Sequence, residues 1–346
     1  MLNPRDVKTV QDAKRIVEER GLSHIKVGVF DNDGVMRGKY LSRSKFFSAL
    51  DSGFAFCDVV LGWDVKDQLY DNAQYTGWHT GYPDAPVRVL PHTCRDLPFE
   101  NGMLLFICEF AEAAEKVCPR GTLRRVIERC KAMGFDAFAA LEYEFFMFDE
   151  TPESAREKGF RNLKPFTPDW FGYSMIRNSV HAELYHEILE MAERMDFPIE
   201  GLHTETGPGV LEAAIAYDRA EAAADKGALF KTFMKVLAQR NGLMATFMAK
   251  WSGKYPGQSG HIHVSLRDLA SGKSAFYDSS QAHNMSKIQR HFLAGQQRLM
   301  PEFLCMVAPT LNSYRRLIPG FWAPTDATWG VENRTAALRV IPGSDK

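Results

Sequence analysis

The chain alternates short apolar runs with polar, glycine-containing turns, and this pattern predicts a compact first region and a longer second one. For the first region it predicts helices at 6–20 and 45–51, strands at 25–30, 35–41 and 103–110, and a long ordered loop at 62–92. The turn Asp31–Gly34 between two apolar runs is typical of a β-hairpin. Residues 1–112 are therefore predicted to form a small domain of mixed helices and strands.

The second region continues the same mixture. It contains predicted helices at 118–133, 181–195, 218–241 and 284–299, and predicted strands at 141–149, 198–203, 210–215, 244–250 and 261–266. Thr122 is the expected cap of its first helix and Gly134 the expected end. Residues 150–180, with Pro, Gly and aromatic residues, are interpreted as an insertion or lid. The pattern indicates the α+β class, with a second domain at 113–346.

The strand Leu141–Asp149 is apolar and aromatic, yet it contains Glu142 and Glu144. Because side chains alternate along a strand, both carboxylates leave the same face, about 7 Å apart. Two like charges on a buried strand repel and lose hydration, so a divalent cation is the simplest group to offset them. An edge strand with one solvated face would also explain the pattern.

Further candidate ligands follow this strand. The turn Gly207-Pro208-Gly209 can bring Glu205 and Glu212 face to face, although a surface hairpin would have the same sequence. Alternation then places His261, His263 and Ser265 on one strand face. A His-x-His pair on a strand is a common metal arrangement and is also frequent as a purely structural feature.

Three arginines lie among apolar neighbours, namely Arg316, Arg334 and Arg339. Arginines in such places pair with carboxylates or phosphates, either as structural salt bridges or as ligand contacts. Carboxylates hold divalent cations, the cations hold a nucleoside triphosphate, and arginines neutralise a moving phosphoryl group. The sequence contains no P-loop or kinase signature, so any nucleotide is expected on another scaffold.

Composition narrows the class of protein. Lys and Arg number 42 and Asp and Glu 43, which gives a net charge of −1 and argues against a nucleic-acid or membrane-surface partner. No apolar run reaches the length of about 18 residues that a membrane helix needs, and the amino terminus lacks a signal-peptide pattern. The six cysteines form no CxxC pair and are expected as reduced thiols. We therefore expect a cytoplasmic protein.

The order of these motifs resembles the glutamine synthetase family. The motifs are Glu-x-Glu-Phe, Glu-x-Gly-Pro-Gly-x-x-Glu, Phe-Met-x-Lys, Ser-Gly-x-x-His before Ser-Leu, Asn-Ser-Tyr-x-Arg-Leu-x-Pro-Gly, and Asn-Arg-x-Ala-x-x-Arg. The resemblance covers residues 118–346 and, more weakly, the first 112. It implies a small N-terminal β-grasp domain, a catalytic domain of curved antiparallel sheet with helices, and a ring-shaped homo-oligomer in which the small domain completes a neighbour's site.

The resemblance also implies a role for each candidate residue. Glu144, Glu205 and Glu212 match ligands of a first Mg²⁺ or Mn²⁺ ion, and Glu142 and His261 match ligands of a second. His263 and Ser265 match positions near ATP. Arg316 matches the residue that grips the α-carboxylate of glutamate, and Arg334 and Arg339 match residues facing the phosphates. The implied reaction forms γ-glutamyl phosphate from glutamate and ATP, and an amine then displaces phosphate.

Three departures from the family pattern shape the expectation. The family's Pro-Gly-Tyr-Glu-Ala-Pro loop reads Pro319-Gly-Phe-Trp-Ala-Pro324, so Trp322 replaces the Glu that helps bind ammonium. The stretch that lends an Asp to ammonium reads Phe56-Cys-Asp-Val-Val60, which leaves the part played by Asp58 open. The chain ends at Lys346, before the family's Glu-x-Arg strand. We expect a C-terminally incomplete sequence that joins glutamate to an organic amine; plain glutamine synthetase and an inactive family member are the alternatives.

Overall fold

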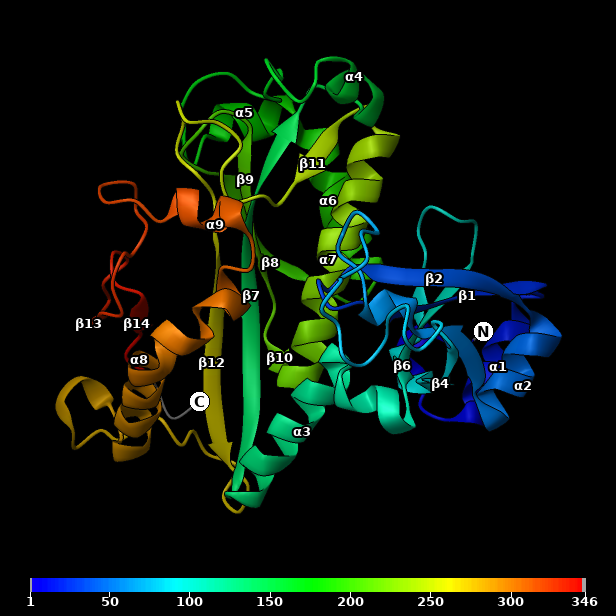
Figure 1. The fold of residues 1–346 in the computed structure, drawn as a ribbon. Coiled ribbons are helices and arrows are strands. Elements are labelled where there is room, and N and C mark those ends of the chain that lie inside the picture. The colour runs from blue at the N-terminus through cyan, green and yellow to red at the C-terminus, as the bar shows by residue number, and fades with distance from the viewer. Residues whose placement is uncertain (1, 344–346) are drawn as a thin grey trace. The chain divides into compact units, whose positions relative to one another are not determined.

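The computed structural model describes residues 2–343, which form two compact units (Figure 1). The first unit comprises residues 1–128, 187–198 and 225–232, and the second comprises 129–186, 199–224 and 233–346. Each unit is described by itself below. The predicted domain boundary after residue 112 stays a prediction, since the first unit also takes in residues from later in the chain.

The first unit is built on a mixed sheet with the strand order β2-β1-β6-β4-β3, and β5 pairs with β6. The elements that belong wholly to this unit are α1 (Val10–Glu19), β1 (His24–Phe30), β2 (Met36–Ser42), α2 (Arg43–Ser52), β3 (Phe54–Cys57), β4 (Asp84–Val89), β5 (Arg95–Asp96) and β6 (Leu104–Phe110). Strands β1 and β6 run parallel and the other pairs antiparallel. Every residue of β6 is buried, as expected of a central strand covered on both faces.

The predicted hairpin is confirmed. Strands β1 and β2 pair antiparallel from His24 opposite Ser42 to Phe30 opposite Met36. The carboxylate of Asp31 accepts hydrogen bonds from the backbone N–H groups of Asp33 and Val35, which closes the turn.

Two local predictions are wrong. The long loop 62–92 contains β4, whose side chains alternate between exposed and buried. The strand was hidden because Asp84 and Pro86 read as turn residues, yet both lie on its exposed positions. The helix α3 (Pro119–Ala132) begins with Pro119 at its first position, and Thr122 lies inside it, donating its backbone N–H to the carbonyl of Cys118.

The second unit contains an antiparallel sheet centred on β7 (Phe135–Phe148). Its order is β10-β7-β9-β8, and β11 and β12 also pair with β7. The other strands of this sheet are β8 (Ile199–Thr204), β9 (Val210–Ile215), β10 (Asp218–Arg219), β11 (Met244–Thr246) and β12 (Gly260–Asp268). Strands β13 (Trp329–Val331) and β14 (Leu338–Val340) form a separate parallel pair.

Helices α4 (Pro152–Glu157), α5 (Met175–Val180), α8 (Lys287–Val307) and α9 (Leu311–Arg316) belong to the second unit. Helices α3, α6 (Ala182–Arg194) and α7 (Ala220–Arg240) contribute residues to both units. Phe292 of α8 packs with Leu266 of β12 and with Phe276, so the start of α8 is anchored against the long sheet. Within residues 2–343, no helix is long and apolar enough to cross a membrane.

A buried charge network holds the start of α3 in the first unit. The guanidinium of Arg120 donates to both carboxylate oxygens of Asp225, at 3.0 and 3.1 Å, and to Glu109 at 2.7 Å. All three side chains are nearly inaccessible to solvent. Removing one partner of such a network leaves buried charge without compensation.

Arg120→Ala is therefore expected to lower the free energy of unfolding by about 3–5 kcal/mol. Arg129→Ala, an exposed arginine on the same helix, is the matched control and should change it by less than about 0.5 kcal/mol. Urea unfolding followed by circular dichroism measures both. Equal effects of the two substitutions would contradict the role given to Arg120.

Candidate metal and substrate site

The register of four neighbouring strands brings the candidate ligands onto one face of the long sheet. On β7, Glu142 lies opposite His261 of β12, and Glu144 lies opposite Glu212 of β9. On β8, His203 lies opposite the same Glu212. Because directly paired residues point to the same side of a sheet, these side chains share one face. Alternation places residues of one strand on one face, and the pairing between strands brings the candidate ligands of β7, β8, β9 and β12 onto a single face.

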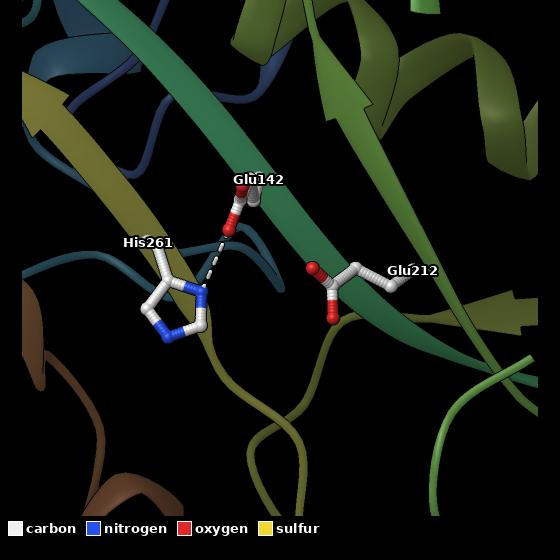
Figure 2. A group of neighbouring side chains, drawn as sticks. All are labelled: Glu142, Glu212 and His261. Carbon is white, nitrogen blue, oxygen red and sulfur yellow. Dashed lines mark ion pairs between the residues drawn. The ribbon is translucent and has the colours of Figure 1, made fainter. Parts of the chain in front are cut away.

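Glu142 is held by two imidazoles. Its carboxylate oxygens lie 3.0 Å from Nδ1 of His261 and 3.1 Å from Nε2 of His263. Figure 2 shows the side chains of Glu142 and His261 directed at one another, with Glu212 beside them. The hydrogen bonds from His261 and His263 hold the pKa of Glu142 well below its usual range. This carboxylate is therefore ionised at neutral pH.

Glu144 has the opposite electrostatic environment. Burial, together with the negative charges of Glu212 and Glu205, raises the pKa of Glu144 to about 7. A hydrogen bond from the backbone N–H of Ser259 to its Oε2, at 2.7 Å, acts in the other direction. The pKa of Glu212 is also raised, first by burial and also by the charges of Glu142 and Glu205. The cluster thus carries more negative charge than its surroundings compensate.

Two sets of donor atoms in this cluster could each hold a cation. One set is Glu142, Glu212 and His261, and the other is His203, Glu205 and Glu212; within each set the donor atoms lie within 4.8 Å of one another. Carboxylates with one imidazole suit Mg²⁺ or Mn²⁺. The raised pKa values of Glu144 and Glu212 show that burial and the neighbouring negative charges disfavour their ionised forms, which a bound cation would favour. The residues present therefore fit a divalent cation.

The division of ligands between the two predicted ions stays a prediction. The family resemblance implies that Glu144 groups with Glu205 and Glu212, and Glu142 with His261. In the structure Glu212 belongs to both donor sets and Glu144 to neither, although the charges of Glu212 and Glu205 act on Glu144. The predicted ligands lie together on one face of the sheet around β7, and a structure with bound metal would assign them to separate ions.

Two residues at this site were missed from the sequence. His203 stands two residues before Glu205, so strand alternation would have placed both on one face; its Nδ1 lies 3.9 Å from Oε1 of Glu205. Tyr173 comes from the predicted lid at 150–180, and its ring stacks on His203 with centroids 4.4 Å apart. No local pattern joins Tyr173 to His203, because 30 residues separate them.

Arg316 is buried at the end of α9 and lies close enough to Glu144 for each charge to act on the other. Its Nη1 donates to the carbonyl oxygen of Phe321 at 2.6 Å. The loop Pro319–Pro324, which carries Trp322, is therefore tied to a residue beside the carboxylate cluster. The indole of Trp322 is 70% exposed.

The other predicted site residues make no direct polar contact with the carboxylate cluster among the described residues. Arg339 is ion-paired with Glu332 at 2.5 Å, and Arg334 is exposed, with its charge acting on Tyr173. Ser265 of β12 lies opposite Phe138 of β7 and on the same face of β12 as His261 and His263. Within residues 2–343, no hydrogen bond or ion pair joins Arg334, Arg339 or Ser265 to the carboxylates.

Comparison with known proteins identifies the class to which this fold and site belong. The glutamine synthetase catalytic domain matches residues 116–346. Type-1 glutamine synthetase 2 of Dictyostelium discoideum is 45% identical over 92% of this chain and 62% of its own length. Glutamate–isopropylamine ligase of a Pseudomonas species is 32% identical over 98% of this chain and 75% of its own. The chain belongs to the glutamine synthetase family.

Two further comparisons agree with this. The γ-glutamylethanolamide synthetase of Streptomyces coelicolor is 34% identical over 96% of this chain and 72% of its own length. A solved GmaS complex with ADP superimposes with a TM-score of 0.80, at 23% identity, over 94% of this chain and 73% of that one. At that identity the superposition establishes the fold alone. The chain spans between about three fifths and three quarters of the length of these proteins.

Metal binding should depend on pH through Glu144. Below its pKa of about 7 the carboxyl holds a proton that a cation must displace, and above it the carboxylate is free to attract the cation. Through Glu144, affinity for Mn²⁺ should therefore rise by up to about tenfold per pH unit below that pKa, and this contribution should level off above it. Loss of a proton from His261, whose pKa is also raised, should add to the rise. Calorimetric titration in two buffers of different ionisation enthalpy, at pH 6 and pH 8, measures the affinity and the protons released.

Glu144→Gln is the matched variant, since it keeps the shape of the side chain and removes the titrating group. It should show a smaller difference in Mn²⁺ affinity between the two pH values, and the difference that remains should come from His261, whose pKa is raised by the neighbouring carboxylates. An affinity of the unsubstituted protein that does not change with pH would show that Glu144 is not protonated in the metal-free site.

Proposed function

We propose that this protein is an ATP-dependent ligase that joins the γ-carboxylate of glutamate to an organic amine. Membership of the glutamine synthetase family supports the reaction class. The sheet-face cluster of Glu142, Glu144, Glu205 and Glu212 supports the use of divalent cations, since such a cluster gains most from positive charge. Glutamate and ATP are both anionic, so the same cations are needed between them.

The proposed chemistry has two steps. The γ-carboxylate oxygen of glutamate attacks the γ-phosphorus of ATP, which forms γ-glutamyl phosphate and releases ADP. The amine nitrogen then attacks the acyl carbon, loses a proton and expels phosphate. A bound Mg²⁺ or Mn²⁺ would neutralise phosphate charge at Glu142, Glu205, Glu212 and His261. The protein's own contribution is to hold the two anions in line and to exclude water.

The proposed residues divide this task. Arg316, buried beside Glu144, is proposed to hold the α-carboxylate of glutamate. Arg334 and Arg339 are proposed to face the phosphates; the ion pair of Arg339 with Glu332 would then be exchanged for a phosphate contact. His263 and Ser265 lie on the face of β12 that carries His261, which supports their proposed place near ATP.

The preference for an organic amine is carried by one observation, the presence of Trp322 in the loop tied to Arg316. Ammonium is small and strongly hydrated, so its capture needs oxygen ligands. An indole supplies an apolar wall and a cation–π contact of about 0.5–2 kcal/mol. Asp58, the other acid considered, is buried in the first unit and accepts a hydrogen bond from Thr76 at 2.6 Å.

Relatives support both this proposal and its nearest alternative. Two of them are named for amides of isopropylamine and ethanolamine, which are organic amines. The relative at 45% identity is named a glutamine synthetase, so ammonia is the second candidate amine. We also propose, from the family resemblance, a β-grasp first domain ending near residue 112, a ring-shaped homo-oligomer with shared sites, and a cytoplasmic location. The mixed sheet that pairs β1 with β6 in parallel supports the β-grasp proposal.

The amine proposal predicts the outcome of a competition. Purified full-length protein with glutamate, Mg²⁺ and ATP is given ammonium, methylamine, ethanolamine, isopropylamine or putrescine, and the γ-glutamyl product is measured by mass spectrometry. At least one organic amine should show a kcat/KM at least about tenfold above that of ammonium at neutral pH, equivalent to about 1.4 kcal/mol.

Trp322→Glu should move the preference towards ammonium, because it restores an oxygen ligand, while Trp322→Phe should keep the organic amine. Two results would contradict the amine proposal: ammonium as the preferred substrate, or an unchanged preference in Trp322→Glu. No product with any of the five amines would reject the ligase itself.

A further inference from the structure

Arg316 is buried, and no acidic side chain among the described residues forms an ion pair with it. Its side chain is 6% exposed, its Nη1 donates to the carbonyl of Phe321, and its Nε has no hydrogen-bond partner among the described residues. A Cβ atom on Gly257 would come within 2.0 Å of the Cδ atom of Arg316. The arginine is therefore packed directly on backbone, and Gly257 leaves the room that its stem needs.

Lys250 is fixed next to the same loop. Its backbone N–H donates to the side-chain oxygen of Asn312 at 2.8 Å, and its carbonyl accepts from the side-chain amide of Asn312 at 2.7 Å. This reciprocal pair ties the segment before Gly257 to α9. The ammonium of Lys250 is buried, lies 4.8 Å from the ring centroid of Phe321, and has no hydrogen-bond partner among the described residues.

The two cations thus approach one residue, Phe321, from two sides: Arg316 at its carbonyl and Lys250 at its ring. Within residues 2–343, neither cation has a carboxylate within salt-bridge distance. Burial lowers the pKa of Lys250, and the charge of Arg316 lowers it further. Burying an ammonium without a partner is costly, and a second cation beside it adds repulsion. A purely structural pair would be expected to include an acid.

We propose that Lys250 and Arg316 together form an anion pocket beneath the loop Pro319–Pro324, and that Lys250 binds the α-carboxylate of the acid substrate jointly with Arg316. The inference rests on the proposed function for the identity of that substrate. A carboxylate accepts several hydrogen bonds, so one anion can satisfy the free Nε of Arg316 and the free ammonium of Lys250. Lys250 is then a substrate-binding residue.

The proposed pocket lies next to the loop that carries Trp322. Phe321 contacts both cations and directly precedes Trp322, whose backbone adopts a φ of 58° that residues other than glycine rarely take.

The test measures binding of L-glutamate and of L-isoglutamine, whose α-carboxylate is an uncharged amide. Calorimetry in the presence of Mg²⁺ and a non-hydrolysable ATP analogue is applied to unsubstituted protein, Lys250→Met and Lys250→Arg. Lys250→Met should weaken glutamate binding by about tenfold to a hundredfold and leave isoglutamine binding within about twofold. Lys250→Arg keeps the charge and should restore most of the glutamate affinity.

Thermal unfolding without ligand separates binding from a structural role. Removing a buried cation that has no partner should leave the melting temperature of Lys250→Met unchanged or raised. The pocket is rejected if Lys250→Met binds glutamate as tightly as the unsubstituted protein, if it loses both ligands equally, or if it melts at a clearly lower temperature or fails to fold. Unsubstituted protein that binds no glutamate would also reject it.

Different results would reject the ligase and the anion pocket. Protein that binds glutamate through Lys250 but forms no γ-glutamyl product with any amine would keep the pocket and reject the ligase. Protein that makes product while Lys250→Met binds glutamate normally would keep the ligase and reject the pocket.

Discussion

The partial burial and mutual repulsion of carboxylates on one sheet face are the constraint on which the rest of this structure depends. The pairing of β7 with β9 brings Glu142, Glu144 and Glu212 together, and burial, followed by the charges of the neighbouring carboxylates, raises the pKa values of the last two. A fold keeps such an arrangement only if something compensates it. Within the chain the compensation is partial: two imidazoles serve Glu142, and Ser259 donates one backbone hydrogen bond to Glu144.

The surroundings are built to hold this unfavourable group in place. The long central strand β7 is paired on both sides, so the carboxylates stand on backbone that cannot easily shift. The aromatic side chains of Phe146 and Phe148 pack with Val210 at the apolar end of the same strand. Arg316 lies at the end of α9, and its positive charge interacts with the carboxylate of Glu144. The sheet pairing and aromatic packing around β7 thus hold close together carboxylates that repel one another.

Strand alternation alone was enough to place Glu142 with Glu144 and His261 with His263. The pairing of β7 with β12, which brings Glu142 opposite His261, does not follow from alternation. The contribution of His203 could not be recognised without the register of β8 against β9, which is set by pairing over the whole strand. Lys250 is recognisable in the sequence only as the last residue of the Phe-Met-x-Lys motif, because its position depends on the hydrogen bonds between its backbone and Asn312 of α9. Strand β4 was missed because its exposed positions carry the residues that normally mark turns.

The mixture of helices and strands and the antiparallel sheet of the second unit were predicted for a related reason, whereas the β-grasp first domain stays a prediction. Helices such as α7 and α8 have strong local patterns, and the strands around β7 have clear turn residues between them. The extent of the compact units was not accessible in this way, because parts of α6 and α7 join the first unit through contacts far apart in sequence. Local periodicity predicts elements well, whereas the sharing of a helix between two units is a property of the tertiary fold.

The most direct test of this account is anomalous diffraction from crystals grown with Mn²⁺. The account predicts anomalous density on the face of the long sheet, within coordination distance of Glu212 together with Glu142 and His261, or with His203 and Glu205. Crystals with no manganese at these carboxylates, at a concentration that saturates binding in solution, would contradict it. The repulsion on which the site is built would then have to be compensated by protons alone.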